Sequence, residues 1–195
     1  MPRVSKKQAA ENHTAVIEAA ARLFKARGIQ GVSVPELMAE AGLTHGAFYG
    51  HFDSKEDLAV VACEHAFAEK KALYADVAER HQGDKPAAFA EFVGRYTAKS
   101  HRDQPGLGCP VAALADDAAR GEFKGPLRKA FAAGAEGMVD GVSAMLSGRG
   151  KASRREEALA NVALLVGSLV LARATKGQPI SDEFLLAARE ALVAK

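Results

Sequence analysis

An all-α protein of about nine helices is the fold that the sequence predicts. Apolar residues recur every three to four positions along nearly the whole chain, which is the period of a helix buried on one face. Alanine is frequent, and alanine loses no side-chain entropy on entering a helix. No segment alternates apolar and polar residues over more than a few positions, so strands are not expected. The 195 residues, 48% of them hydrophobic, suffice for a three-helix N-terminal unit and a larger bundle.

The first two helices are marked by their ends. One begins near residue 14, carries Phe24 on its apolar stripe and ends at Gly28. The next begins at Ser33, where Glu36 can complete a capping box, and ends at Gly42.

A third, short helix follows, capped by Thr44 and with Phe48 and Phe52 one turn apart on its apolar side. Ser54 then caps a long fourth helix. Turn residues separate the helices expected after this point. Together with the fourth helix they are Lys55–Arg80, Pro86–His101, Cys109–Arg120, Pro126–Ser147, Arg154–Thr175 and Ser181–Val193.

Composition narrows the classes of function. The net charge of +2 points to no particular partner. The most apolar stretch, Ala158 to Ala172, falls short of the ~18 residues of a membrane span, and the N-terminus resembles no signal peptide. Two cysteines are too few for a disulfide framework. We therefore expect a cytoplasmic protein without contact with a membrane, and no sequence motif indicates an enzyme, a metal site or a cofactor.

The segment LTHGAFYGHFDSKEDL, residues 43–58, predicts a surface that approaches another molecule closely. Beside the Phe48–Phe52 stripe lies an arc with an imidazole, a phenol and two glycines, namely His45, Gly46, Tyr49 and Gly50. Glycines permit close approach, and tyrosine, histidine and threonine can donate hydrogen bonds to phosphate oxygens. Two short helices joined by a tight turn form a helix-turn-helix, so this arc suits a DNA groove.

Positive side chains occur next to this unit and at the N-terminus. Lys55 lies in the first turn of the fourth helix, where backbone amides also favour anions. Arg3, Lys6 and Lys7 form a run without acids, which predicts either a disordered arm along DNA or a solvated tail. Residues 1–60 carry as many acids as bases, so the DNA hypothesis depends on where charges lie.

The segment SVPELMAEAGLTHGAFYGHFDSKEDL, residues 33–58, resembles the DNA-binding region of TetR/AcrR-type transcriptional regulators. With the helix before it, the resemblance covers residues 12–60. The resemblance implies phosphate contacts by Thr44, Tyr49, His51 and Lys55, base contacts by His45 and Gly46, and core positions for Phe48 and Phe52. At Gly50 many family members have an aromatic residue instead. The predicted DNA-binding set is Arg3, Lys6, Lys7, Ser33, Thr44, His45, Gly46, Tyr49, Gly50, His51 and Lys55.

The remaining helices resemble the family in plan only, which implies an effector pocket in a helical bundle. Ordinary core packing accounts for the same aromatic pattern, and the sequence does not separate the two. The candidate lining residues are Phe67, Phe89, Phe92, Tyr96, Cys109, Leu114, Phe123, Phe131 and Met138.

Cys109 is a separate candidate because it precedes Pro110 at a predicted helix N-terminus, a position that favours a thiolate. It is a small buried hydrophobe, an electrophile or redox sensor, or, most remotely, the nucleophile of a thiol-dependent enzyme. Cys63 lies among apolar residues and is expected to be structural.

The last two helices predict a dimer interface, since the first of them is apolar on more than one face and rich in small residues. One recognition helix reads too few base pairs for useful specificity, which favours a dimer over the alternative that these residues complete the monomer core. The residues concerned are Leu159, Ala163, Val166, Gly167, Val170, Leu171, Phe184, Leu185, Ala188 and Leu192.

These expectations combine into one hypothesis. Residues 1–53 are the DNA-binding domain and residues 54–195 the effector-binding and dimerisation domain. The resemblance implies a homodimeric repressor that binds a palindromic operator and is released by a small molecule; a repressor that senses electrophiles through Cys109 is the alternative. The sequence leaves open the effector, the operator, the regulated genes, and whether the protein represses or activates.

Overall fold

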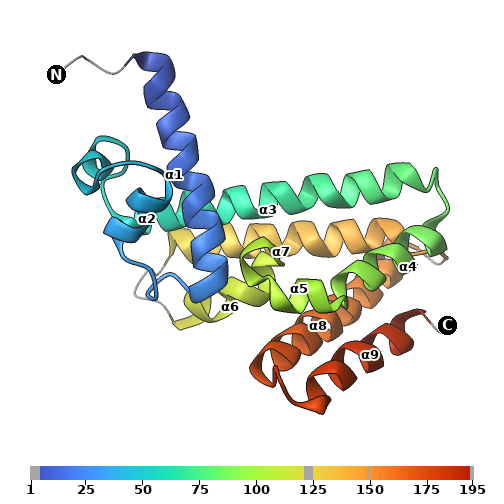
Figure 1. Cartoon of the computed structure of the whole chain (residues 1–195). Helices are drawn as coiled ribbons and strands as arrows, with labels where there is room; N and C mark the ends of the chain where they lie inside the picture. The colour runs from blue at the N-terminus through green and yellow to red at the C-terminus, as the bar shows by residue number, and fades with distance from the viewer. Residues whose placement is uncertain (1–4, 121–124, 149, 194–195) are drawn as a thin grey trace.

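The computed structural model describes residues 5–120, 125–148 and 150–193, and within them the chain is all-α (Figure 1). In chain order the elements are α1 Lys6–Arg27, α2 Val34–Glu40, the 3₁₀ helix η1 His45–Gly50, α3 Lys55–Arg80, α4 Lys85–Tyr96, α5 Lys99–Asp103, the 3₁₀ turn η2 Pro105–Leu107, α6 Pro110–Arg120, α7 Pro126–Met145, α8 Lys151–Ala174 and α9 Pro179–Val193. Figure 1 shows α1, α2 and η1 gathered at one end of α3, with α7 alongside α3 and with α8 and α9 forming the opposite side of the bundle.

The predicted caps set three of the helix ends. The Ser33 backbone N–H donates to Glu36 Oε2 over 2.8 Å, and the Ser33 hydroxyl accepts from the Glu36 backbone N–H over 3.4 Å, which completes the capping box. Ser54 caps α3 by accepting from the Asp57 backbone N–H over 3.0 Å. Gly28 ends α1 with a φ of 74°, a left-handed conformation that glycine adopts without strain.

The prediction of a disordered basic arm was wrong for Lys6 and Lys7. Helix α1 begins at Lys6, well before residue 14, because Ser5 caps it by accepting from the Gln8 backbone N–H over 3.1 Å. Lys6 and Lys7 therefore lie in a helical first turn and not in a disordered arm. Arg3 lies outside the described residues.

The helix expected over Pro86–His101 is interrupted. Helix α4 ends at Tyr96 and α5 begins only at Lys99. The Thr97 hydroxyl donates back to the Val93 carbonyl over 2.8 Å, and the His101 ring binds the Tyr96 carbonyl over 2.7 Å. The Val93 carbonyl also accepts the helical bond from the Thr97 backbone N–H, so the hydroxyl adds a second bond there. The His101 ring instead satisfies the Tyr96 carbonyl, which a continuous helix would bond to a backbone N–H, and the chain bends at this point.

Two clusters of buried apolar side chains make up the core. The first joins α1, α2, η1 and the first half of α3, and it takes Leu114 and Leu127 from the bundle. The second joins Val77 near the end of α3 to α4, α7, α8 and α9. Since α3 contributes to both clusters, it connects the N-terminal helices to the bundle, and the division at residue 53 stays a prediction.

Helix α8 is longer than its apolar stretch suggested. Its 24 residues include a window of mean hydropathy 1.5, so by length and composition alone it is long enough to cross a membrane, the one such helix in the described ranges. One face, with Ala158, Leu165 and Leu169, is buried in the second cluster. The opposite face, with Leu159 and Val170, is exposed. Helix α8 therefore packs against the bundle on one face and leaves apolar side chains exposed on the other.

Candidate DNA interface and effector cavity

The segment 45–50 presents its polar residues outward from an apolar anchor. Phe48 and Phe52 are 1% and 7% exposed and pack into the first cluster, whereas Tyr49 is 68% exposed. The Tyr49 ring meets Phe48 edge-on, with ring centroids 5.3 Å apart. His45, Gly46 and Gly50 are also exposed. The predicted division between buried aromatics and an exposed arc is therefore confirmed as geometry.

The segment is a 3₁₀ helix, and Thr44 does not cap it with its side chain, so the expected cap was wrong. The Thr44 backbone is extended, and its carbonyl accepts from Ala47 N–H over 3.0 Å. A tight 3₁₀ turn uses backbone bonds between residues three apart and leaves less need for a side-chain cap. The exposed Thr44 hydroxyl is consequently not committed to a helix cap.

Within the part of the chain that the structure describes, neither packing nor backbone conformation requires glycine at Gly46 or Gly50. A Cβ atom built on either would meet no heavy atom within 4 Å. Neither residue has the positive φ that favours glycine. Open space at both positions is what a surface needs if another molecule is to approach the backbone closely.

His51 and Lys55 flank the arc and are half-buried. The His51 ring lies 5.9 Å from the ring of His13, which in turn stacks on Phe52 with centroids 4.7 Å apart. Sequence reasoning had no ground to single out His13, because a lone polar residue on an amphipathic helix carries no motif. Its stacking on Phe52 places an imidazole from α1 beside the predicted phosphate-contacting His51.

Ser33 is exposed, but its hydroxyl already donates to Glu36 Oε2 over 2.7 Å. Hydrogen bonds from the backbone and hydroxyl of Ser33, and then from Arg27, lower the pKa of Glu36 to about 2. Ser33 is therefore engaged in the capping box, which weakens it as a DNA contact.

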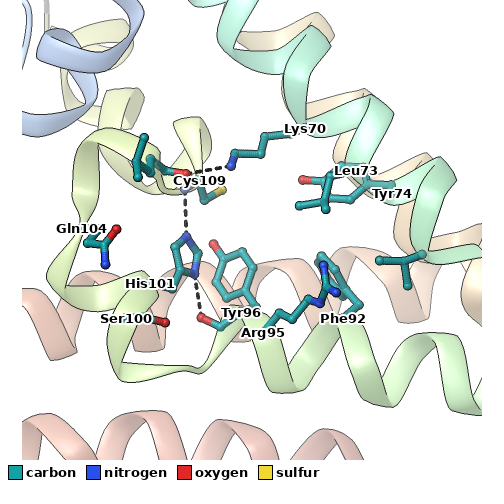
Figure 2. A pocket seen from close by; sticks show the side chains of 12 residues that line it. Lys70, Leu73, Tyr74, Phe92, Arg95, Tyr96, Ser100, His101, Gln104 and Cys109 are labelled. Atoms are coloured by element: carbon teal, nitrogen blue, oxygen red, sulfur yellow. Dashed lines mark hydrogen bonds between the residues drawn. The ribbon is translucent and has the colours of Figure 1, made fainter.

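A cavity of about 240 Å³ lies between α3, α4, α5, η2 and the start of α6 (Figure 2). Its walls are mainly apolar and aromatic, and its polar groups come from several elements. The lining residues are Lys70, Leu73, Tyr74, Val77, Phe92, Arg95, Tyr96, Ser100, His101, Gln104, Leu107 and Cys109.

Three of the predicted pocket residues line this cavity, namely Phe92, Tyr96 and Cys109. Most of the others serve the core: Phe67 and Phe131 pack edge to face with centroids 5.9 Å apart, and Leu114 belongs to the first cluster. Met138 is buried with its sulfur 4.0 Å from that of Cys109, and Phe89 lies in a separate depression near the end of α9. Phe123 is outside the described residues.

Several lining residues were missed by sequence reasoning. Lys70, Tyr74 and Val77 occur at helical spacing and lie on one face of α3, but a mixed polar and apolar face resembles an ordinary surface. His101 and Gln104 come from the bend that was expected to be helix and linker. Residues such as Lys70 could therefore be assigned to the cavity only from the three-dimensional structure.

His101 joins the two sides of the bend. Its Nδ1 lies 2.7 Å from the Tyr96 carbonyl oxygen and must donate to it, so Nε2 accepts from the Cys109 backbone N–H over 2.9 Å. Burial, and secondarily the charge of Arg173, lower the pKa of His101 to about 4. The neutral ring thus fixes two cavity residues, Tyr96 and Cys109, in place.

Cys109 precedes α6 and is 3% exposed, so its thiol borders the cavity and not open solvent. Both cysteines are free. Burial raises the pKa of the Cys63 thiol to about 12, in agreement with its predicted structural role.

The predicted dimer residues divide into two groups. Leu185, Ala188 and Leu192 of α9 are buried within the monomer, as the monomer-core alternative expects, and their part in a dimer stays a prediction. Because α9 packs directly against α8 and α4, these side chains face inward. On α8, Leu159, Val170 and Leu171 are 43–47% exposed. Ala163 is exposed too, and the three others, Val166, Gly167 and Phe184, are half-buried.

In sequence, the chain resembles known proteins over its N-terminal region. Residues 16–62 match the family described as "Bacterial regulatory proteins, tetR family". The chain is 40% identical over 58 residues to the transcriptional regulator AcrR of Shigella flexneri, a match that covers 30% of this chain and 27% of AcrR. It is equally similar to TtgR of Pseudomonas putida, over 30% of this chain and 28% of TtgR. The chain thus matches little more than a quarter of these relatives' length.

Solved structures extend the likeness to the whole fold. Reduced E. coli NemR superposes with a TM-score of 0.77 at 21% identity, covering 93% of this chain and 94% of NemR. A TetR-family regulator from Cytophaga hutchinsonii gives 0.77 at 22% identity over 99% and 97% of the two chains. One from Legionella pneumophila gives 0.78 at 18% identity over 98% and 97%. At these identities the likeness concerns the fold alone.

Proposed function

We propose that the chain is a regulator of the TetR family, whose model matches residues 16–62, and that it is a cytoplasmic repressor released from DNA by a small molecule. In this proposal a homodimer binds a palindromic operator in successive major grooves. Residues 1–53 bind DNA, and residues 54–195 bind the effector and the second protomer. Regulation of this kind needs no catalytic step and no bound cofactor.

The observation that carries the proposal is the exposed arc on η1. Tyr49 is 68% exposed beside two glycines with open space around their backbone, while Phe48 and Phe52 anchor the segment. A large aromatic side chain left in solvent gains nothing for folding, so its exposure favours an external partner. We assign phosphate contacts to Thr44, Tyr49, His51 and Lys55, and base contacts to His45 and Gly46. Gly50 permits close approach, and Lys6, Lys7, Ser33 and Arg3 remain secondary candidates.

The dimer proposal is supported by the outward face of α8. The exposed leucine and valine side chains on α8 form an apolar strip beside small residues. An exposed apolar strip of this kind often marks a surface that binds another protein chain. A second protomer that covers this strip would also supply the second recognition segment that a palindromic site requires.

A physical route connects the cavity to the DNA-binding helices. The turn η2 packs against α1, and a Cβ atom on Gly106 would come within 3.1 Å of Arg22. On its cavity side η2 is held by Lys70, whose Nζ donates to the Leu107 carbonyl over 2.8 Å. An effector that binds one position of η2 better than another would therefore shift α1 and the recognition segment it supports.

The decisive experiment selects bound sequences from a random DNA pool with the purified full-length protein. We expect a palindromic consensus, and His45→Ala should change the preferred bases within it. Light scattering at micromolar concentration should give the mass of a dimer. A selection without consensus, or a monomer in light scattering, would refute the proposal.

A second candidate, sensing through Cys109, is supported by the position of its thiol at the cavity wall. The fold likeness to reduced NemR adds no residue-level support at 21% identity. Titration with iodoacetamide separates the candidates. Cys109 should react faster than a free thiol if it is a sensor, whereas ordinary or slower reactivity removes both the sensor and the thiol-enzyme hypotheses.

A further inference from the structure

We propose that the cavity binds a small aromatic carboxylic acid, with its carboxylate at Lys70 and the Tyr96 hydroxyl and its ring between the aromatic walls. This inference rests on the proposed function only where it treats the acid as the effector; the binding site itself is argued from the cavity.

The charge of the lining favours an anion. Lys70 and Arg95 contribute positive charge, and the described lining contains no aspartate or glutamate. Arg95 already pairs with Glu91 over 2.8 Å. Lys70 instead donates to a neutral carbonyl, that of Leu107, and among the described residues no carboxylate lies within ion-pair distance of it. An ammonium has three donors, so Lys70 can bind a carboxylate oxygen.

Tyr96 supplies a second, independent observation that points to a polar ligand. Its side chain is 5% exposed, and among the described groups its hydroxyl meets only the Cys109 thiol, in a weak contact outside ordinary hydrogen-bond geometry. The Cys109 thiol, a weak hydrogen-bonding group, is the neighbour that, after burial, most raises the Tyr96 pKa. Figure 2 shows the phenol oxygen directed towards Cys109, with the Lys70 ammonium beyond it on the same side of the pocket. A buried hydroxyl without a partner is costly, and a ligand oxygen would satisfy it.

His101 does not compete for the acid. Both of its ring nitrogens are occupied, one by the Tyr96 carbonyl and the other by the Cys109 backbone N–H. It is also neutral above a pH of about 4, the lowered pKa that its burial causes. It is a positioning residue, and Lys70 and Tyr96 remain the groups that can hold a carboxylate.

The walls favour an aromatic body of modest size. Tyr74 and Phe92 meet edge to face with centroids 5.5 Å apart, and Phe92 continues to Tyr96 at 5.8 Å. Leu73 and Val77 complete the apolar side. A ring can make offset or edge contacts with such a row. The volume of about 240 Å³ lies below the ~300–1,000 Å³ typical of drug-sized sites, which points to a one-ring acid.

The test is calorimetric titration of the full-length protein, without DNA, with trans-cinnamate and with its neutral counterpart cinnamamide. We expect cinnamate to bind about tenfold to a hundredfold more tightly, the range for a hydrogen bond to a charged group. Lys70→Met should remove that preference and leave the amide affinity unchanged. Lys71→Met, an exposed neighbour on the same helix, is the matched control and should bind as the wild type does.

Tyr96→Phe provides a second variant in case Lys70→Met does not fold. It should weaken cinnamate severalfold or more, while thermal unfolding shows a protein at least as stable as the wild type. A merely structural tyrosine would not produce that pair of effects. Equal affinity for acid and amide, an unaffected Lys70→Met variant, or no binding of either compound at millimolar concentration would overturn the proposal.

Operator release is measured separately. Cinnamate that binds through Lys70 but leaves the operator complex intact supports the site and contradicts the acid as effector. A neutral compound that releases the operator from a protein that binds no cinnamate overturns the acid site and leaves the repressor proposal standing.

Discussion

Tyr49 and Tyr96 are the same side chain in opposite surroundings. Tyr49 is 68% exposed on η1 and rests edge-on against the buried ring of Phe48. Tyr96 is 5% exposed at the end of α4, and within the described chain its hydroxyl meets only the weakly hydrogen-bonding Cys109 thiol. Neither position contributes to folding as a well-packed tyrosine would, the first because its ring stays in water and the second because its buried hydroxyl lacks a good partner. The comparison underlies the two binding surfaces that we propose, which differ in their chemistry.

The glycines of the two regions differ in a related way. A Cβ atom on Gly50 would meet nothing described within 4 Å, whereas one on Gly134 of α7 would clash with the Phe67 ring. Gly134 is therefore required by packing between α7 and α3. Gly50 is free of such a requirement, so any selection for glycine there acts through a partner outside the monomer.

The largest expected effect is on DNA binding. Tyr49→Ala should lower affinity for the selected operator by about tenfold to a hundredfold, because alanine has no phenol for the proposed phosphate contact. The free energy of unfolding should change by no more than about 0.5 kcal/mol, since the side chain is exposed. Electrophoretic mobility shift and urea denaturation measure the two quantities.

Lys55→Ala should also reduce the slope of log affinity against log salt by about 1 for each phosphate that is no longer neutralised, with Lys71→Ala as control. Wild-type affinity and salt slope in both variants would contradict the interface.

The next largest effect is on the pH dependence of stability, and it tests the burial of His101 beside the cavity. His101 has a pKa of about 4 in the fold against about 6.5 in an unfolded chain, so the unfolded chain binds an extra proton between these values. The resulting stabilisation is complete above pH 6.5 and is lost as the pH falls toward 4, by on the order of 2 kcal/mol. Urea denaturation from pH 7 to 4.5 should show a steeper loss in wild type than in His101→Gln. His45→Gln, at an exposed position, should retain the wild-type slope; identical slopes in all three proteins would argue against the buried ring.

Tyr96→Phe tests the unpaired hydroxyl directly. Without ligand, the variant should be more stable by about 1 kcal/mol, because the cost of burying the hydroxyl disappears. For a chain of this length that corresponds to a rise in Tm of about 2–4 °C. Tyr49→Phe, the matched change at the exposed tyrosine, should leave Tm unaltered. A lower Tm for Tyr96→Phe would mean that the hydroxyl is satisfied in the native protein.

The smallest expected effect is that of Gly50→Ala on stability. The free energy of unfolding should stay the same or rise by up to about 0.5 kcal/mol, because alanine restricts the unfolded chain and has space in the fold. Operator affinity should nevertheless fall, since a methyl group would separate the segment from the groove. Mobility shift and urea denaturation on the same sample measure both; unchanged DNA binding would remove Gly50 from the interface.

Local patterns predicted the N-terminal region well because its determinants are close in sequence. The Ser33–Glu36 capping box, the Ser54 cap and the Phe48–Phe52 anchor each involve residues three or four apart. The errors in this region concern weaker local signals, namely the cap on α1 at Ser5 and the 3₁₀ geometry that leaves Thr44 without a capping role. Periodicity alone does not distinguish a 3₁₀ turn from one turn of α-helix.

The cavity was predicted only in part for the opposite reason. Phe92, Tyr96 and Cys109 were among the candidates, but Lys70 and His101 were not. Their roles depend on contacts with residues 37 and 8 positions away, Leu107 and Cys109. Aromatic residues at helical spacing fit a core or a cavity equally, so Phe67 and Phe131 turned out to belong to packing.

By itself, the sequence determined an all-α chain whose N-terminal helices bury two phenylalanines and expose an arc of glycine, histidine and tyrosine. It did so because helix periodicity and caps are properties of neighbouring residues. Only the tertiary structure decided which aromatic residues border a cavity, that His101 is neutral between two backbone groups, and that Leu185 and Leu192 face the monomer core. These depend on how α3, α4, α6 and α9 pack together, and packing brings together residues whose separation along the chain carries no local signal.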